Sequence, residues 1–158
     1  MKNSKTNVMR VLDQHKIPYI PYTYGDGITA VSGTEVAGIL GKDPLSVFKT
    51  LVTAGKTGTH YVFVIPVCSE LDLKKAAEAV GEKNIEMIRS KELLPLTGYV
   101  HGGCSPIGMK KNFATVVDSS ARDLPSITFS GGRIGCQVEI APADLEKVIP
   151  VRYADVAA

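Results

Sequence analysis

The stretch from residue 46 to residue 81 constrains the fold most, because two β-rich runs and a helix follow one another there. The runs SVFKTLVTA and HYVFVIPV are separated by the polar, glycine-containing GKTGT, which predicts a hairpin at the centre of a sheet. In LDLKKAAEAVG the apolar residues form one helical stripe between Asp72, where the helix begins, and Gly81, a favourable stop. The sequence therefore predicts a sheet with at least one helix packed against it.

The flanking segments predict further helices and short strands. A helix is expected over residues 5–16, an edge strand in IPYIPYTYG, and a short helix after the capping box SGTE. A helix from Ser90 to Leu94, stopped by Pro95, follows the short apolar run IEMI. The last third predicts three strands and a helix, in ATVVDSS, SITFSGG, CQVEIAP and PADLEKVIP. Three successive strands argue against a repeating βαβ fold, so we expect an α+β fold with one mixed sheet and helices outside it.

Composition limits the class of protein. With 158 residues, 44% of them hydrophobic, the chain is expected to form one domain over residues 1–158. Eighteen basic against 16 acidic side chains give a charge of +2, too balanced to identify a nucleic-acid binder by charge alone. Cys68, Cys104 and Cys136 form no CxxC pair, which argues against a disulfide framework or a zinc site and favours a reducing cytoplasm. The apolar runs are too short for a membrane span, and we expect a soluble cytoplasmic protein.

Three familiar sites are excluded by their spacing. GKT lacks the upstream glycine of a phosphate-binding P-loop, since Thr50 stands at that position. GGRIG precedes an expected strand rather than a helix, which excludes a dinucleotide-binding turn. The three histidines show no metal-hydrolase spacing, so no metal and no cofactor is predicted.

Lys49 is a single cation inside an apolar strand. By alternation it shares a face with Val47 and Leu51, and Thr50 belongs to the opposite face. A lysine on an apolar face either extends its stem to solvent or meets an anionic ligand. Both interpretations remain open from the pattern alone.

The segment HGGCSPIGMKK, residues 101–111, allows three interpretations. Cys104 could be a nucleophile activated by His101, although no nucleophile elbow surrounds it. Gly102 and Gly103 could form only a tight turn before Pro106. The same glycines could instead present backbone N–H groups to a developing oxyanion.

Four blocks in register resemble the YbaK family of freestanding aminoacyl-tRNA deacylases, which is related to the editing domain inserted in bacterial prolyl-tRNA synthetases. The blocks are FKTLV, GGCSPIG, FSGGRIG and VEIAPADL, and the likeness extends from KIPYIPYTY to LEKVI. The resemblance implies a mixed, barrel-like sheet flanked by helices. It also implies hydrolysis of mischarged tRNA, with Cys-tRNA(Pro) the expected substrate and with assistance from the substrate's own thiol or ribose hydroxyl.

The resemblance also assigns roles to individual residues. It implies three catalytic residues, namely Lys49, which holds the tRNA acceptor end, and Gly102 and Gly103, which belong to the loop that faces the ester. The implied substrate-binding residues are Tyr24, Thr50, Ser105, Pro106, Ser130 and Gly131. Two structural alternatives remain, since Tyr24 could only cover an edge strand and Ser130 could only bond to the turn near Gly132.

Three functions remain in competition. The first is a hydrolase whose partners are the acceptor end of aminoacyl-tRNA and, by resemblance, prolyl-tRNA synthetase, with no role for DNA or membranes. The second is a noncatalytic module of the same fold that docks a tRNA or a synthetase. The third is an enzyme or redox sensor that depends on the Cys104 thiol.

Overall fold

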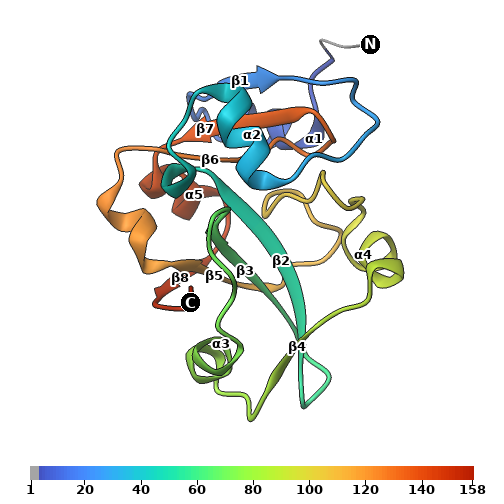
Figure 1. Ribbon diagram of the computed structural model, residues 1–158, viewed down its shortest axis with the longest axis vertical. Coiled ribbons are helices and arrows are strands. Elements are labelled where there is room, and N and C mark those ends of the chain that lie inside the picture. Colours follow the sequence, from blue (N-terminus) through green and yellow to red (C-terminus); the bar gives the residue numbers. More distant parts are fainter. Residues whose placement is uncertain (1–3) are drawn as a thin grey trace.

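The computed structural model describes residues 4–158 and contains five α-helices and two β-sheets within that range. The larger sheet, in the order β4-β2-β3-β5-β8, occupies the lower part of Figure 1, and the smaller sheet, β1-β7-β6, lies above it. This arrangement confirms the α+β class. It differs from the expected single sheet, because the strands divide into two groups that meet at the beginning of β2.

The larger sheet combines antiparallel and parallel strands. The hairpin of β2 and β3 is antiparallel with Phe48 opposite Pro66, which confirms the predicted sheet centre. β4 pairs with the far end of β2, whereas β5 runs parallel to β3 and β8 runs parallel to β5. The bounds are β2 (Phe48–Gly55), β3 (His60–Pro66), β4 (Ile85–Met87), β5 (Ala114–Asp118) and β8 (Val151–Ala154).

The smaller sheet is antiparallel throughout. β7 (Cys136–Ile140) lies between the edge strand β1 (Ile20–Thr23) and β6 (Ile127–Ser130). A single parallel bridge between Val47 and Thr128 joins this sheet to the residue that precedes β2. The start of β2 therefore stands at the junction of the two sheets, where both can contribute side chains to one site.

Three helices begin at polar caps, and two of these caps, Ser32 and Asp72, are the ones that the sequence predicts. The side chains of Thr6, Ser32 and Asp72 each accept a hydrogen bond from a first-turn backbone N–H. α2 and α3 end at Gly41 and Gly81, both in the left-handed region, and the stop at Gly81 was predicted. The bounds are α1 (Asn7–Gln14), α2 (Gly33–Leu40), α3 (Leu73–Val80) and α5 (Pro142–Val148), with short 3₁₀ turns at Pro44–Ser46 and Ser119–Asp123.

The helix α4 (Ser90–Thr97) continues through Pro95, where the sequence predicted a stop. A proline removes one hydrogen bond, the one its own N–H would have donated to the Lys91 carbonyl, and Lys91 is exposed so that water can replace it. The last turn is held by two other bonds. Thr97 Oγ1 donates to the Leu93 carbonyl at 2.8 Å, and the Gly98 N–H donates to the Leu94 carbonyl at 2.9 Å.

The main hydrophobic core lies between the two sheets. Phe129 from β6, Val62 and Val64 from β3, and Leu12 from α1 belong to one buried cluster. A second cluster, around Phe63, lies on the other face of the larger sheet. Burying both faces of β3 explains why its sequence is a continuous apolar run rather than an alternating one.

A polar network ties α2 to the smaller sheet. The Glu139 carboxylate on β7 accepts hydrogen bonds from Tyr22 at 2.6 Å, from Lys42 just after α2 at 2.8 Å, and from Ser126. Burial acts to raise the pKa of Glu139, but these donors outweigh it and hold the pKa at about 2. The network fixes α2 against β7, on one side of the junction between the sheets.

Candidate functional site

A cavity of about 360 Å³ lies at the junction of the two sheets, within the size range of small-molecule sites. It is bordered by the start of β2, the start of α2, the end of β6, the start of β7, and a loop over residues 101–104 that follows α4. Its lining residues are Tyr24, Val31, Ser32, Gly33, Val36, Val47, Phe48, Lys49, Thr50, Leu51, Val67, Leu93, His101, Gly102, Cys104, Ser130 and Gln137. Five residues expected from the sequence are in this set, namely Tyr24, Lys49, Thr50, Gly102 and Ser130.

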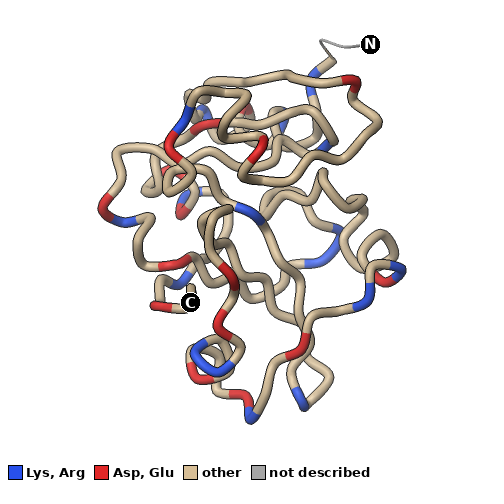
Figure 2. The backbone as a smooth tube through the Cα atoms, viewed as in Figure 1, with Lys and Arg blue, Asp and Glu red and all other residues tan. Residues whose placement is uncertain are grey.

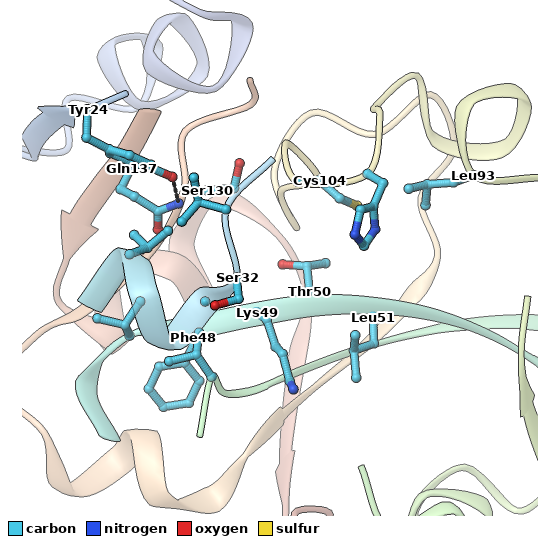
Figure 3. A pocket seen from close by; sticks show the side chains of 17 residues that line it. Tyr24, Ser32, Phe48, Lys49, Thr50, Leu51, Leu93, Cys104, Ser130 and Gln137 are labelled. Atoms are coloured by element: carbon cyan, nitrogen blue, oxygen red, sulfur yellow. Dashed lines mark hydrogen bonds between the residues drawn. The ribbon is translucent and has the colours of Figure 1, made fainter. Parts of the chain in front are cut away.

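Lys49 and Thr50 both line the cavity although they lie on opposite faces of β2, as Figure 3 shows. The strand permits this because β4 pairs only with Thr53–Gly55, which leaves the first residues of β2 without a ladder partner on that edge. Side chains from both faces of a free strand edge can reach the same space. Within residues 4–158, the Lys49 ammonium makes no hydrogen bond and no ion pair, which leaves it available to an anionic ligand.

Two buried side-chain atoms without hydrogen-bond partners belong to cavity-lining residues. They are Thr50 Oγ1 and Gln137 Oε1, the two such atoms found among residues 4–158. A buried polar atom without a partner is unfavourable by about 1–3 kcal/mol, so a fold keeps one where a ligand can satisfy it. The cavity thus offers unused hydrogen-bonding capacity from two different sheets.

Gln137 was not predicted from the sequence. Its Nε2 donates a hydrogen bond to Tyr24 Oη at 3.3 Å, which leaves the other end of the amide unpaired (Figure 3). Burial raises the pKa of Tyr24, so its hydroxyl stays protonated and can hold the amide. The signal in the sequence was an amide inside the otherwise apolar part of CQVEI.

The 101–104 loop presents backbone to the cavity at Gly102. This residue has φ +89°, and a Cβ there would come within 2.8 Å of the Ala30 Cβ. Within residues 4–158, the N–H groups of Gly102 and Cys104 have no acceptor. The Gly103 N–H, in contrast, donates to the Val100 carbonyl at 3.0 Å, and Gly103 is outside the lining set.

The remaining expected residues support the walls. Ser105 is fully buried, and its Oγ accepts a hydrogen bond from the Ile107 N–H at 3.3 Å. Pro106 borders a smaller hollow instead. Gly131 lies against Cys136, whose Sγ would be 2.5 Å from an added Cβ. These three residues lie outside the lining set of the main cavity.

Ser130 combines the two roles that the sequence left open. It lines the cavity, and its Oγ also accepts a hydrogen bond from the Gly132 N–H at 3.1 Å. The turn bond uses one lone pair of the hydroxyl, whereas its proton remains free to be donated. Ser130 can therefore hold the turn and still contact a ligand.

Cys104 lacks the surroundings of an activated nucleophile. Burial raises the pKa of its thiol to about 12, although a hydrogen bond with Thr97 acts to lower it. Within residues 4–158, no hydrogen bond joins Cys104 to His101, and His101 is exposed. A thiol with so high a pKa is protonated at neutral pH, which does not favour nucleophilic attack.

No group of three or more His, Cys, Asp or Glu side chains among residues 4–158 is placed to hold a metal ion. No helix in that range has the length and apolar character needed to cross a membrane.

Comparison with known proteins places the chain in a family. Residues 29–148 match the model of the aminoacyl-tRNA editing domain, which covers most of the chain and every residue of the cavity lining except Tyr24. The chain belongs to this editing family. That membership confirms the resemblance noted in the sequence.

Individual relatives agree with this assignment. This chain is 43% identical to EbsC of Enterococcus faecalis, which is described as a candidate Cys-tRNA(Pro)/Cys-tRNA(Cys) deacylase. The match extends over 152 residues, which are 96% of this chain and 93% of the relative. It is 30% identical over 90 residues, 57% of this chain, to a proline–tRNA ligase of Pelobacter propionicus, of which the match covers 16%.

Solved structures show the same fold. A crystal structure of a hypothetical protein has a TM-score of 0.87 at 25% identity, with 97% of this chain and all of that chain covered. A structure described as a candidate trans-editing enzyme for prolyl-tRNA synthetase has a TM-score of 0.81 at 23% identity, with 98% and 99% covered.

Proposed function

We propose that the protein hydrolyses the ester of mischarged aminoacyl-tRNA and that Cys-tRNA(Pro) is its substrate. The observation that carries the proposal is the cavity itself, whose lining residues include a lysine without a partner, two residues with unpaired buried oxygen atoms, and Gly102 and Cys104, whose backbone N–H groups have no acceptor within residues 4–158. Membership of the editing family and the description of the 43% identical relative support the choice of reaction and substrate.

Lys49 binds the tRNA acceptor end in this proposal. Its ammonium has no partner within residues 4–158, and it lies at the cavity on the face of β2 opposite Thr50 (Figure 3). A compact, strongly hydrated cation suits a phosphate oxygen of the terminal nucleotides. Lys49 would thus position the terminal ribose, and with it the ester, within the cavity.

The ester then needs little more than water and oxyanion stabilisation. Water adds to the carbonyl carbon, the carbonyl oxygen becomes an oxyanion, and the N–H groups of Gly102 and Cys104 donate hydrogen bonds to it. When the bond between the carbonyl carbon and the ribose oxygen breaks, that oxygen takes up the proton lost by the water. The products are the free amino acid and the intact tRNA.

The amino-acid end of the substrate meets the unpaired acceptors. The α-ammonium group carries three donors, and Gln137 Oε1 and Thr50 Oγ1 are buried acceptors without partners. A charged donor satisfying them strengthens binding more than a neutral one would. This contact would hold the aminoacyl group in one orientation against the 101–104 loop.

We assign the proton transfer to the substrate rather than to a protein base. The buried Cys104 thiol is not ionised at neutral pH and cannot act as a base, because burial raises its pKa to about 12. A hydroxyl of the terminal ribose, or the cysteine thiol of the substrate, can relay the proton because it is held next to the ester. The proposal also includes delivery of the correct tRNA by prolyl-tRNA synthetase. A chain with a net charge of only +2 attracts tRNA weakly by itself, so a partner that already holds the tRNA would supply it.

The test compares the deacylation rates of cysteinyl-, alanyl- and prolyl-tRNA(Pro) by the wild type, Lys49→Ala and Cys104→Ala. We expect cysteinyl-tRNA to be cleaved fastest, Lys49→Ala to lose most of this activity, and Cys104→Ala to keep it. Loss of activity in Cys104→Ala alone would replace the proposal with a thiol mechanism. Binding of tRNA without any turnover by the wild type would leave the noncatalytic module instead.

A further inference from the structure

The segment from residue 89 to residue 111 differs in charge from the rest of the chain. It contains four of the 18 basic side chains and one of the 16 acidic ones, a net charge of +3. The remaining residues carry 14 basic and 15 acidic side chains, a net charge of −1. The near-neutral total therefore conceals a local excess of positive charge.

The four basic residues gather around α4. Arg89 is its N-cap and Lys91 is in its first turn, whereas the Lys110 N–H donates to the carbonyl of Thr97, the last residue of the helix, at 3.0 Å. The Lys110 side chain lies over the end of the helix, since a Cβ on Gly98 would be 3.3 Å from Lys110 Cγ. Figure 2 shows these basic positions in blue on α4 and on the chain beside it. We call the set Arg89, Lys91, Lys110 and Lys111 the α4 basic patch.

The cations of the α4 basic patch are available to a partner. All four residues are exposed, and none of their side chains forms an ion pair within residues 4–158. The acidic residue of the segment, Glu92, uses its carboxylate to accept a hydrogen bond from the Arg89 N–H at 2.7 Å. An eight-residue helix is about 12 Å long, so the patch can follow several successive phosphates of a nucleic-acid strand.

The patch adjoins the cavity, and the chain on the other side of the cavity lacks a comparable set of basic residues. Leu93 of α4 and the 101–104 loop form one wall of the cavity, between the two parts of the patch. On the other side, residues 17–41 contain no lysine or arginine, and their two charged side chains are the exposed Asp26 and Glu35. Figure 2 shows acidic positions on the loop after β1 and on α2. A polyanion whose end lies in the cavity is therefore attracted more strongly toward the α4 side than toward the side formed by residues 17–41.

We infer that the α4 basic patch is the docking surface for the acceptor stem of tRNA, whose terminal ester lies in the cavity. This inference rests on the proposed function for its choice of nucleic acid. The terminal nucleotides would pass Lys49, and the phosphates of the stem would continue over α4 toward Lys110 and Lys111. Lys49 in the cavity and the cations of the α4 basic patch would then contact one continuous sugar–phosphate backbone of the tRNA.

The test uses Lys91→Gln/Lys110→Gln/Lys111→Gln and a matched control, Lys56→Gln/Lys74→Gln/Lys83→Gln. Both variants lose three positive charges. The control residues are exposed, form no side-chain ion pair within residues 4–158, and lie on the hairpin turn, on α3 and just after α3. Binding of uncharged proline tRNA and kcat/KM on cysteinyl-tRNA(Pro) are measured at several salt concentrations. The cysteinyl ester of adenosine, which has no stem, serves as the second substrate.

We expect only the patch variant to change the salt dependence of tRNA binding. Loss of three phosphate contacts lowers the slope of log K against log salt by roughly 2 to 3. Between about 50 and about 200 mM salt, the wild type and the control then lose roughly 20- to 40-fold more affinity than the patch variant. Hydrolysis of the adenosine ester should be the same in all three proteins.

Three results would overturn the inference. Binding of tRNA by the patch variant that is unchanged from the wild type would mean that the stem lies elsewhere, or that the patch serves an acidic protein surface. Equal losses in both variants would mean that the protein responds only to total charge. Reduced hydrolysis of the adenosine ester by the patch variant would mean that the cavity itself was damaged. Failure of the proposed function is distinguishable, because the wild type would then bind tRNA without cleaving either ester.

Discussion

Thr50→Val should make the protein more stable and less active. The substitution replaces a buried hydroxyl by a methyl group of similar size, and that hydroxyl has no hydrogen-bond partner within residues 4–158. An unsatisfied buried polar group is unfavourable by about 1–3 kcal/mol, so its removal should raise the free energy of unfolding by about 1–2 kcal/mol. For a chain of this length each kcal/mol corresponds to about 2–4 °C in Tm.

A matched substitution on the same strand should change the free energy of unfolding in the opposite direction and serves as a control. Thr53 is fully buried on β2, and its Oγ1 donates to the Tyr61 carbonyl at 2.9 Å. Thr53→Val removes that hydrogen bond and should lower the free energy of unfolding by about 1 kcal/mol. The two substitutions are chemically identical, so any difference between them comes from the partner of the hydroxyl.

Thermal unfolding and deacylation of cysteinyl-tRNA(Pro) would be measured on both variants. If the Thr50 hydroxyl binds substrate, kcat/KM should fall about tenfold in Thr50→Val, which corresponds to ~1.4 kcal/mol of lost transition-state stabilisation. A lower Tm for Thr50→Val would refute the claim that the hydroxyl is unsatisfied. A higher Tm with unchanged activity would show that the unpaired atom is not a substrate ligand.

Three further predictions concern the loop, the polar network and the thiol. Gly102→Ala should lower the free energy of unfolding by about 1–2 kcal/mol, because Gly102 has a positive φ. Adding Ala30→Gly removes the contact with the new Cβ and should recover deacylation activity, but the backbone strain should remain. Measuring unfolding and deacylation of the double variant tests this. The pKa of Glu139 is about 2 in the folded protein and near 4.5 in the unfolded chain, so its carboxylate contributes stability above about pH 4.5 that is lost as the pH falls toward about 2. Glu139→Gln should therefore flatten the fall in stability that an acid titration measures across that window. Iodoacetamide at neutral pH should modify the exposed Cys68 and spare Cys104, whose pKa is about 12, and peptide mass spectrometry would contradict this if both react alike.

Predictions that depended on neighbouring residues were confirmed by the structure. Asp72 and Gly81 bound α3, Ser32 caps α2, and the hairpin of β2 and β3 forms where GKTGT separates two β-rich runs. Caps and turns are local, since each is satisfied by backbone groups within a few residues. Pro95 was the exception, because a helix can lose one hydrogen bond when water reaches the carbonyl left free.

The placement of strands was less accessible from the sequence. The strand β8 was missed, and its pairing with β5 joins residues far apart in the chain. Nothing local distinguishes strands that enter the larger sheet, such as β5, from those that enter the smaller one, such as β6. Sheet membership is decided by which apolar faces can be buried together, and this depends on the whole chain.

The candidate site also combines features that the sequence indicates with features that only the tertiary structure determines. Residue types alone offered its chemistry as one of several interpretations, since the lysine in an apolar strand could meet an anion or extend to solvent, and the paired glycines before Pro106 could form a backbone contact or only a turn. Only the tertiary structure decided that Gln137 joins the site and that the Gly103 N–H is already bonded to Val100. A sequence specifies which donors and acceptors a chain carries. Which of them remain unpaired depends on the contacts made when the two sheets come together, and those unpaired groups are the ones left to bind a ligand.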